Sequence, residues 1–305
     1  MAYFNIVAQS SESTVVTEYT PKGKRSEGYQ SEAQLEQEFI RMLQDLGYGY
    51  LQIHKEADLI VNLRVQLSKV NNYEFTDGEW DRFFKEVLAN PNADIAEKSR
   101  LIQEDHVQVL KRDNGESKNI TLIDKKNIHN NVLQVVNQYT VSTDDGAKHD
   151  NRYDVTILVN GLPLVHIELK RRGVPIREAF NQINRYQRDS FWAASGLYQF
   201  VQIFVISNGT NTKYYSNTTR HNHIKDANSQ KAKKEKTSNS FEFTSFWADA
   251  NNRIIPDLID FTKTFFAKHT ILNILTRYCV FTAEKMLLVM RPYQIVATER
   301  IINRI

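Results

Sequence analysis

The chain has 305 residues, of which 41% are hydrophobic and only 6 are proline, so we expect a globular protein with one large core or two modest ones. Its 39 Lys and Arg residues against 36 Asp and Glu residues give a net charge of +3, too small an excess to indicate a nucleic-acid partner by itself. A single cysteine, Cys279, excludes an intrachain disulfide, and the absence of a long apolar run predicts a cytoplasmic protein without a membrane partner.

The N-terminal part is predicted to be largely helical. Residues 1–28 are rich in Ser, Thr and Gly and indicate an irregular or loosely docked arm. Ser31 then precedes apolar residues at helical spacing and Gly47 follows them, which predicts an amphipathic helix over 32–46. Helical patterns recur at three places: 61–70, 77–89 (stopped by Asn90-Pro91) and 95–105.

From about residue 107 the pattern changes to strands. Apolar runs at 107–110, 120–123 and 132–141 are separated by polar connections. The following elements are predicted in turn: a hairpin over 153–170, a helix at 176–186, a strand at 198–206 and an edge strand at Tyr214-Tyr215. Strands that alternate with helices predict an α/β core, and the sequence has no internal repeat.

Positive charge gathers at two places along the chain. Lys170, Arg171 and Arg172 form the first cluster, and the stretch from Arg220 to Lys236, with its lysines at 231–236, forms the second. Lysine runs without interleaved aromatic residues are common in loops, so a solvated surface loop is the simpler interpretation of the second cluster.

The predicted hairpin over 153–170 has one apolar and one polar face on each strand. Apolar residues alternate from Val155 to Val159 and again from Val165 to Leu169. The opposite face collects the following polar residues: Asp154, Thr156, His166, Glu168 and Lys170. For both apolar faces to enter one core, we expect an odd number of loop residues around Asn160-Gly161, with Gly161 left-handed and Asp154 opposite Glu168 or one pair away.

Two carboxylates on adjacent strands destabilise a sheet by roughly 0.2 to 1 kcal/mol, so a compensating partner is expected. A hard divalent cation such as Mg²⁺ binds through one or two carboxylates together with phosphate and water, and it activates bound water. Lys170 beside it could orient a nucleophile or stabilise developing charge. The alternative is that Asp154, Glu168 and Lys170 form the solvated face of an amphipathic hairpin, and alternation alone does not decide between the two.

The stretch Asn151–Lys170 resembles the catalytic hairpin of PD-(D/E)xK nucleases, in the version found in the restriction (R) subunits of type I restriction-modification enzymes. Asp154 matches the metal-binding aspartate, Glu168-x-Lys170 the second motif, and Gln182-x-x-x-Tyr186 the motif on the following helix. Tyr153 stands where the family usually has proline, which leaves the carboxylate in place. The resemblance extends from about residue 30 to the end of the chain.

The resemblance implies roles for residues outside the hairpin. Gln182 and Tyr186 share a helix face and would support the site or touch DNA, and Arg185 would contact a phosphate. The alternative is a core role for Tyr186 and a plain surface charge at Arg185. Glu36 would approach the metal, against the alternative of a first-turn acid that complements its helix dipole. His166 is interpreted as a packing or hydrogen-bonding residue rather than a ligand.

The C-terminal residues Leu288–Gln294 and Ala297 resemble the entry to the first motor domain of superfamily 2 helicases, whose glutamine, here Gln294, recognises adenine. The sequence contains no G-x-x-x-x-G-K-[ST] loop to hold ATP phosphates. We therefore expect a fragment of a longer subunit, in which ATP is a cofactor of the full-length protein alone.

The expected fold is a PD-(D/E)xK restriction-endonuclease-like α/β core, a mixed sheet flanked by helices, with N-terminal helical elements and a C-terminal helical linker. The expected divisions are the arm 1–28, an endonuclease domain 29–262, and a helical linker with the start of the helicase domain over 263–305. Each follows from the resemblance and from the predicted elements.

The resemblance implies an Mg²⁺-dependent endonuclease domain, with Mn²⁺ as an alternative ion, that cuts double-stranded DNA nonspecifically after ATP-driven translocation. Its partners would be the methyltransferase and specificity subunits of the type I complex. One alternative is a non-cleaving DNA-binding or assembly module of that complex. Another is a Holliday-junction or repair nuclease, which the C-terminal motor entry disfavours.

Overall fold

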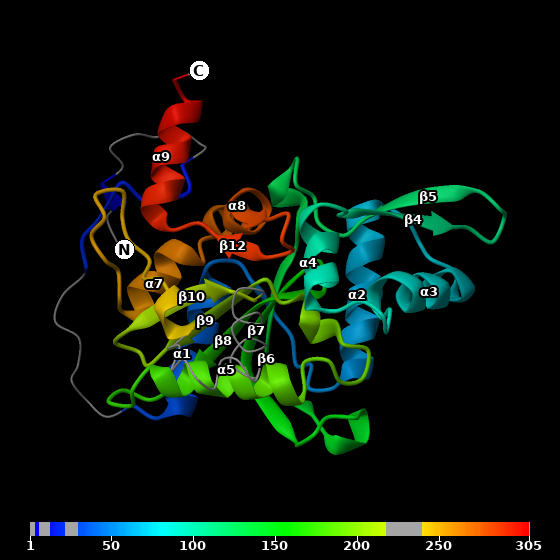
Figure 1. Cartoon of the computed structure of the whole chain (residues 1–305), viewed down its shortest axis with the longest axis horizontal. Helices are drawn as coiled ribbons and strands as arrows, with labels where there is room; N and C mark the ends of the chain where they lie inside the picture. Colours follow the sequence, from blue (N-terminus) through cyan, green and yellow to red (C-terminus); the bar gives the residue numbers. More distant parts are fainter. Residues whose placement is uncertain (1–3, 6–12, 22–29, 218–239, 305) are drawn as a thin grey trace.

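The computed structural model describes residues 4–5, 13–21, 30–217 and 240–304, and the lysine-rich stretch from Arg220 to Lys236 lies outside them. The centre of the molecule is a six-stranded sheet in the order β10-β9-β8-β7-β6-β3 (Figure 1). Its strands are β3 (Gly49–Tyr50), β6 (Leu133–Val141), β7 (Asn151–Val159), β8 (Leu162–Leu169), β9 (Ile203–Ser207) and β10 (Thr212–Ser216). The β8–β9 and β3–β6 pairs are parallel and the other pairs antiparallel, so the sheet is mixed.

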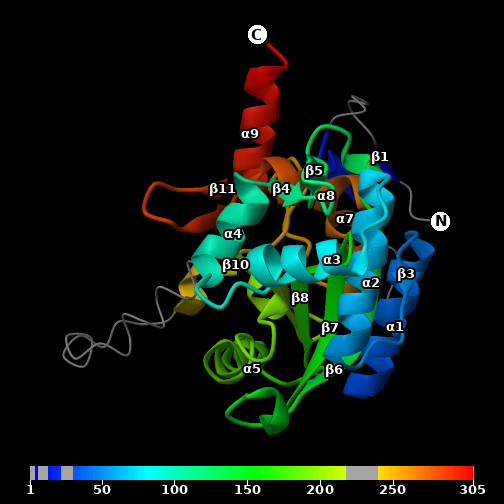
Figure 2. The same cartoon turned by 90° about the vertical axis from the view of Figure 1, so that its right-hand side faces the viewer.

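Helices cover both faces of this sheet. In Figure 2, α5 (Arg177–Asp189) lies on one side of the strands, and α1 (Glu32–Asp45) and α2 (Glu56–Asn71) lie on the other. Both α1 and α5 contact β8, which is buried along its whole length. The predicted mixed sheet flanked by helices is therefore confirmed.

The remaining elements surround this core. They are β1 (Phe4–Asn5), β2 (Glu18–Tyr19), α3 (Asp77–Phe83), α4 (Ile95–Gln103), β4 (Val107–Lys111), β5 (Ser117–Thr121), α7 (Leu258–Phe265), α8 (Lys268–Arg277), β11 (Cys279–Phe281), β12 (Leu287–Val289) and α9 (Pro292–Ile302). The predicted helix over 77–89 occurs as α3 followed by a π-helix at Phe84–Leu88. Within the described residues, no helix is both long and apolar enough to span a bilayer.

Helix α1 forms as its sequence pattern predicts. Ser31 and Gln34 make a capping box, in which the Ser31 hydroxyl accepts the Gln34 N–H and the Gln34 side chain accepts the Ser31 N–H. Phe39 and Leu43 are fully buried on its inner face. Gly47 ends the helical region with a φ of +87°, the left-handed conformation that glycine adopts without a Cβ penalty.

The predicted strand over 198–206 is shorter in the structure. Leu197–Phe200 form a 3-10 helix, and β9 begins at Ile203. Both segments are almost entirely buried, so a continuous apolar run did not reveal where one ended and the other began. Gly196, with a φ of +65°, precedes the 3-10 turn.

The described part of the N-terminal arm that includes residues 13–21 contacts the rest of the protein. Thr14 and Val15 are buried, and the Thr270 hydroxyl donates to the Thr14 carbonyl at 3.1 Å. The expected boundary between residues 262 and 263 falls inside α7, which packs against α1. The domain division stays a prediction.

Candidate active site

The turn between β7 and β8 differs from the expected one. It has two residues, Asn160 and Gly161, with φ values of 52° and 84°, and it joins the directly paired Val159 and Leu162. Two positive φ values match the type I′ turn that suits the twist of a hairpin. The expectation of an odd loop is therefore wrong.

A β-bulge in β8 places the apolar residues of the two strands on the same face, which the odd loop was expected to do. Leu158 pairs with Pro163, whereas Ile157 pairs with Val165, so Leu164 is an extra residue in β8. One extra residue reverses the face on which all later side chains of a strand lie. The apolar residues of both strands consequently share a face, as the alternation predicted.

The bulged register brings the two predicted carboxylates together at one end of the hairpin. Val155 pairs with Ile167, so the next positions along the two strands carry Asp154 and Glu168. One oxygen of Asp154, Oδ2, accepts the Leu169 backbone N–H at 2.9 Å, which holds this side chain across to β8. This hydrogen bond orients Asp154 toward its neighbours.

The site is not the solvated strand face of the alternative interpretation. The Glu168 side chain is fully buried and Asp154 is half-buried, because α1 and α5 cover the two sides of β8. Lys170, with 12% of its side chain exposed, donates from Nζ to Glu168 Oε1 at 3.1 Å. Its Nζ also lies 4.0 Å from Glu32 Oε2, at the start of α1. The predicted catalytic trio is therefore assembled, in a buried setting.

Burial dominates the electrostatics of this trio. Desolvation, reinforced by the neighbouring Glu168 charge, raises the pKa of Asp154 to about 7. Desolvation likewise raises the pKa of Glu168 to about 7, although Lys170 opposes it. Burial also disfavours the charged form of Lys170, but the two carboxylates outweigh it and its pKa is raised. The site thus gathers two ionisable acids that lack sufficient positive charge.

The donor set fits a hard divalent cation. Glu168 Oε2 is buried without a hydrogen-bond partner and is therefore available to a ligand. Across the described ranges no cluster of three or more His, Cys, Asp and Glu residues could enclose a metal. Mg²⁺ does not require such a cage, because it keeps several waters and binds through one or two carboxylates and substrate phosphates. Asp154 and Glu168 are the residues that could hold it.

His166 lies beside the site as a buried, neutral ring. Its Nε2 is 3.6 Å from Glu168 Oε2, and its Nδ1 is 3.2 Å from the Thr156 hydroxyl. Burial lowers its pKa to about 4. The rings of Tyr153 and Tyr186 pack edge-on against it, which agrees with a packing role, and the interpretation of His166 as a residue other than a ligand stays a prediction.

Gln182 and Tyr186 form a relay from α5 to the strand that carries Asp154. The Gln182 side-chain amide donates to the Tyr186 hydroxyl, which donates to the Arg152 carbonyl at 2.8 Å. Tyr186 is fully buried, whereas Gln182 is half-buried. The relay therefore fixes the β7 backbone two residues before Asp154.

Arg185 is exposed on α5 and lies at the edge of the site. Its guanidinium carbon is 5.5 Å from the centre of the Tyr186 ring. Its charge also opposes, less strongly than Lys170, the burial that raises the pKa of Glu168. The position suits a phosphate contact.

Glu36 is not the first-turn acid of the alternative interpretation, because the acid in the first turn of α1 is Glu32. Glu36 is 8% exposed on the inner face of α1, and its Oε1 accepts the Asn137 amide at 2.6 Å. The Gln138 amide donates to the other oxygen, Oε2. Burial raises the pKa of Glu36, and the Asp154 charge adds to this effect. Glu36 thus lies near Asp154 with both oxygens engaged by neutral donors.

Three residues around the carboxylates escaped the sequence analysis. Asn137 and Gln138 hold Glu36, and Gln138 has a φ of +53° between the paired positions that flank Asp154. Arg152 is exposed and its charge opposes the raised pKa of Glu36. Two adjacent polar amide residues, Asn137 and Gln138, inside a largely apolar strand were the available signal.

Gln294 lies far along the chain from these residues, near the start of α9. Its side chain accepts the Arg291 backbone N–H at 2.9 Å and so completes a capping box. The side chain is otherwise exposed. Recognition of adenine by Gln294 stays a prediction about a longer protein.

Comparison with known proteins agrees with the sequence motifs. The family model described as the N terminus of type I restriction enzyme R protein matches residues 29–223. The type I restriction enzyme EcoprrI endonuclease subunit of Escherichia coli is 48% identical over 300 residues, which cover 98% of this chain and 90% of that protein.

Two staphylococcal relatives are much longer than this chain. The SsaAORF53P endonuclease subunit of Staphylococcus saprophyticus and the SauMSSORF170P endonuclease subunit of Staphylococcus aureus, both of type I restriction enzymes, are 37% and 35% identical over 282 residues. These residues cover 90% of this chain but 27% of each relative.

Proposed function

Because this chain belongs to the family of type I restriction enzyme R protein N termini, we propose that it is an endonuclease domain that hydrolyses DNA phosphodiester bonds with Mg²⁺. The observation that carries the proposal is the half-buried Asp154 beside the fully buried Glu168, with Glu168 Oε2 unpartnered and Lys170 Nζ 3.1 Å from Glu168 Oε1. Two adjoining carboxylates that are largely removed from water do not stabilise a fold when charged, so a ligand of opposite charge is their simplest explanation. The mixed sheet and this hairpin also support a PD-(D/E)xK core.

Each side chain of the site has a distinct task in this proposal. Asp154 and Glu168 would hold Mg²⁺ (or Mn²⁺), which when bound lowers the pKa of water and neutralises phosphate charge. Lys170, held against Glu168, would orient the attacking water or stabilise the charge that develops on the phosphate. Gln182 and Tyr186 would keep the β7 backbone in place. Glu36 would lie close to the metal beside Asp154, while Asn137 and Gln138 donate hydrogen bonds to its two oxygens.

The activity of the longer proteins is a further part of the proposal. Relatives that are named endonuclease subunits extend well beyond the matched region. We propose that motor domains outside this chain use ATP, with Gln294 at the adenine, to move double-stranded DNA before nonspecific cleavage at this site. Methyltransferase and specificity subunits would select the target.

The test is plasmid cleavage by the full complex that carries Glu168→Gln, with ATP hydrolysis measured in parallel. Cleavage should fall by roughly two to three orders of magnitude while ATP hydrolysis persists, because one metal ligand is lost and the fold is kept. Glu116→Gln, on the exposed β4–β5 hairpin, is the matched control and should leave both activities unchanged.

Calorimetry distinguishes an active site from a module that only docks on DNA. Titration of Mg²⁺ or Mn²⁺ into the chain should give binding heat that Asp154→Ala abolishes. DNA binding that shows no metal response in either protein would support the non-cleaving module and count against the nuclease.

A further inference from the structure

We propose that Arg185, Arg188 and Trp192, the "α5 ridge", form a DNA-binding surface beside the active site, on which Trp192 packs against the sugar and base edges of the duplex. The ridge continues from the C-terminal half of α5 into the loop after it. This inference rests on the proposed DNA substrate, but its test does not depend on cleavage.

Trp192 is unusual among the tryptophans of the chain. It is 41% exposed, whereas Trp80 is 8% and Trp247 is 0% exposed. Its indole Nε1 donates to the Arg188 carbonyl at 3.1 Å, which ties the ring to the last turn of α5. An exposed ring held in one place is suited to making a contact, since little conformational freedom remains to be lost on binding.

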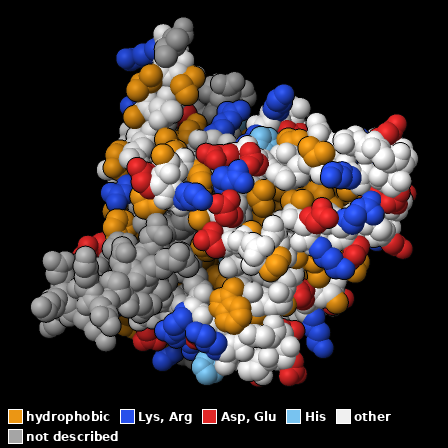
Figure 3. All heavy atoms as spheres, turned by 45° about the vertical axis from the view of Figure 1, so that its right-hand side comes forward, with side chains coloured by type: hydrophobic (Ala, Val, Ile, Leu, Met, Phe, Trp, Pro, Cys, Tyr) orange, Lys and Arg blue, Asp and Glu red, His pale blue; other side chains and the backbone are white. Residues whose placement is uncertain are grey.

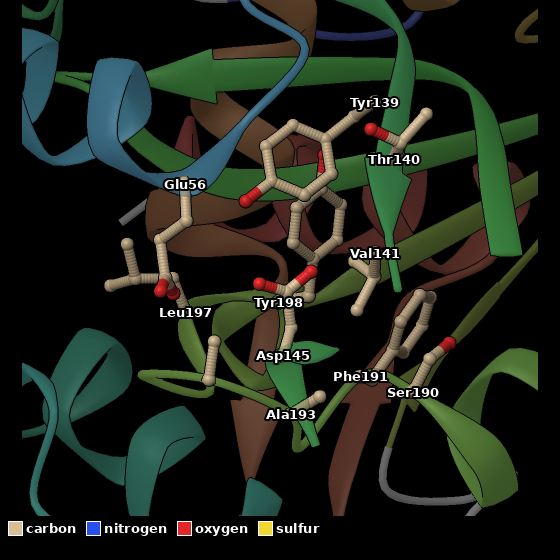
Figure 4. A pocket seen from close by; sticks show the side chains of 11 residues that line it. Glu56, Tyr139, Thr140, Val141, Asp145, Ser190, Phe191, Ala193, Leu197 and Tyr198 are labelled. Carbon is tan, nitrogen blue, oxygen red and sulfur yellow. The ribbon is translucent and has the colours of Figure 1, made fainter. Parts of the chain in front are cut away.

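The loop that presents Trp192 is anchored to two other helices, α2 through Glu56 and α4 through Lys98. Glu56 accepts the Ser195 N–H at 2.9 Å, and the buried Lys98 donates to the Gly196 carbonyl at 2.7 Å. Phe191 and Ala193, the neighbours of Trp192, are buried and line a small pocket with Glu56 and other residues (Figure 4). The pocket has about 10 Å³ of space, enough for roughly one water molecule. The loop is therefore packed down on the protein.

The ridge carries positive charge next to the carboxylates. Arg185 and Arg188 are exposed and three residues apart, so they neighbour each other on the helix surface. Figure 3 shows a gathering of Lys and Arg side chains beside a large exposed hydrophobic side chain at the lower edge of one face.

Acidic groups are present at the ridge as well. Asp189 is buried and binds Arg188 through Nε at 2.9 Å and Nη2 at 3.1 Å, which orients that guanidinium and offsets its positive charge with a carboxylate. Asp144 and Asp150 lie in the loop that Lys148 joins to Asp189 through its backbone N–H. Arg185 is therefore the principal cation of the ridge.

Duplex DNA is the partner that this combination fits. Arginines bind phosphates and fix the register of a duplex, while apolar side chains press into its grooves between sugars and bases. Because Arg185 lies at the edge of the Glu168 site and Trp192 at the end of the same helix, one stretch of duplex can reach both. A protein partner would not require the continuity of this surface with the active site.

The experiment uses tryptophan fluorescence of the chain with a 20-base-pair duplex and EDTA, so that no cleavage occurs. Trp192 is the exposed one of three tryptophans, and it should become protected from iodide quenching when DNA binds. Trp192→Ala should weaken DNA binding roughly tenfold, because the apolar contact of the ring with sugar and base edges is lost, and Trp192→Phe should restore most of the affinity.

Salt dependence tests the arginine separately. Arg185→Ala should reduce the slope of log K against log salt by about 0.9, the value for one phosphate contact. Lys111→Ala, an exposed charge on the distant β4–β5 hairpin, should leave the slope unchanged (Figure 1). The proposal of a DNA-binding α5 ridge would be overturned if iodide still quenched Trp192 fully in the DNA complex, or if the chain bound no DNA at low salt. A loss of cleavage alone would count against the proposed nuclease activity and not against the ridge.

Discussion

Two antiparallel hairpins of this chain share a sequence pattern but not an environment. In the β4–β5 hairpin, Val107 and Val109 are 43% and 60% exposed, while Leu110 and Ile120 are buried. In the β7–β8 hairpin every residue of β8 is buried, Glu168 included. Alternation therefore identifies which residues share a face, and the elements packed above that face determine whether a charge on it meets water.

The turns of the two hairpins differ in the same way. The β4–β5 hairpin has the three-residue loop Asp113–Gly115 with a left-handed glycine, the type of loop that we expected in β7–β8. A Cβ on Gly115 would meet no atom within 4 Å, whereas one on Gly161 would lie 2.6 Å from the Leu63 Cα in α2. The same residue type thus serves an open turn in one hairpin and a close backbone contact in the other.

The largest stability difference should follow from this contact. Gly161→Ala should lower the free energy of unfolding by about 2 to 5 kcal/mol, because left-handed strain adds to a clash with backbone that cannot rotate away. Gly115→Ala should lower the free energy of unfolding by about 1 to 2 kcal/mol, because it adds left-handed strain without a clash. Urea unfolding of both variants measures the difference, and equal costs would show that α2 shifts to admit the methyl group.

The next effect concerns the pH dependence of stability without divalent metal. The folded-state pKa values of Asp154 and Glu168, about 7, lie above those of the unfolded chain. The stabilisation from their protonation is therefore fully present below about pH 4 and is lost as pH rises through 7. Thermal unfolding in EDTA should show a fall in Tm over this range that Glu168→Gln reduces. Saturating Mg²⁺ should reverse the fall, and an equal slope in the variant would contradict the assignment.

A smaller effect on stability is expected when one glutamate of each hairpin is replaced, measured at pH 8 without metal. Glu168→Gln should raise the free energy of unfolding by about 1 to 2 kcal/mol, because it removes a buried charge yet keeps an acceptor for Lys170. Glu116→Gln should cause no measurable change, because Glu116 pairs with Arg112 in solvent. Destabilisation by Glu168→Gln would mean that the buried charge supports the fold rather than a ligand.

Much of the fold followed from local pattern. Helix α1, its Ser31 cap and its Gly47 end lay where the spacing of apolar residues predicted them, since these signals act within one or two turns. The polar face with Asp154 and Glu168 was also correct. The reason proposed for it was wrong, because a two-residue turn and a bulge at Leu164 replaced the odd loop. An odd loop, or a two-residue turn with a bulge, places the apolar residues of both strands on one face. The alternation of residues along the strands could therefore not distinguish the two.

The surroundings of the site could not be derived in this way. Glu36 is separated by about a hundred residues from Asn137 and Gln138, which donate to both of its oxygens. The helical pattern around Glu36 showed an acidic residue near the start of a helix, but it did not show which residues hydrogen-bond to that acid. Such a contact depends on the angle at which α1 crosses β6, and the spacing of residues along one element does not determine that angle.

By itself the sequence determined which side chains could act together, because strand alternation and helical spacing assign Asp154, Glu168 and Lys170 to one face and Gln182 and Tyr186 to another. Only the tertiary structure decided that this face is buried, because the sheet lies between α1 and α5, and that Trp192 is presented beside it. The physical reason is that periodicity is a property of a single element, whereas burial and its effect on pKa arise from elements that are distant in the chain.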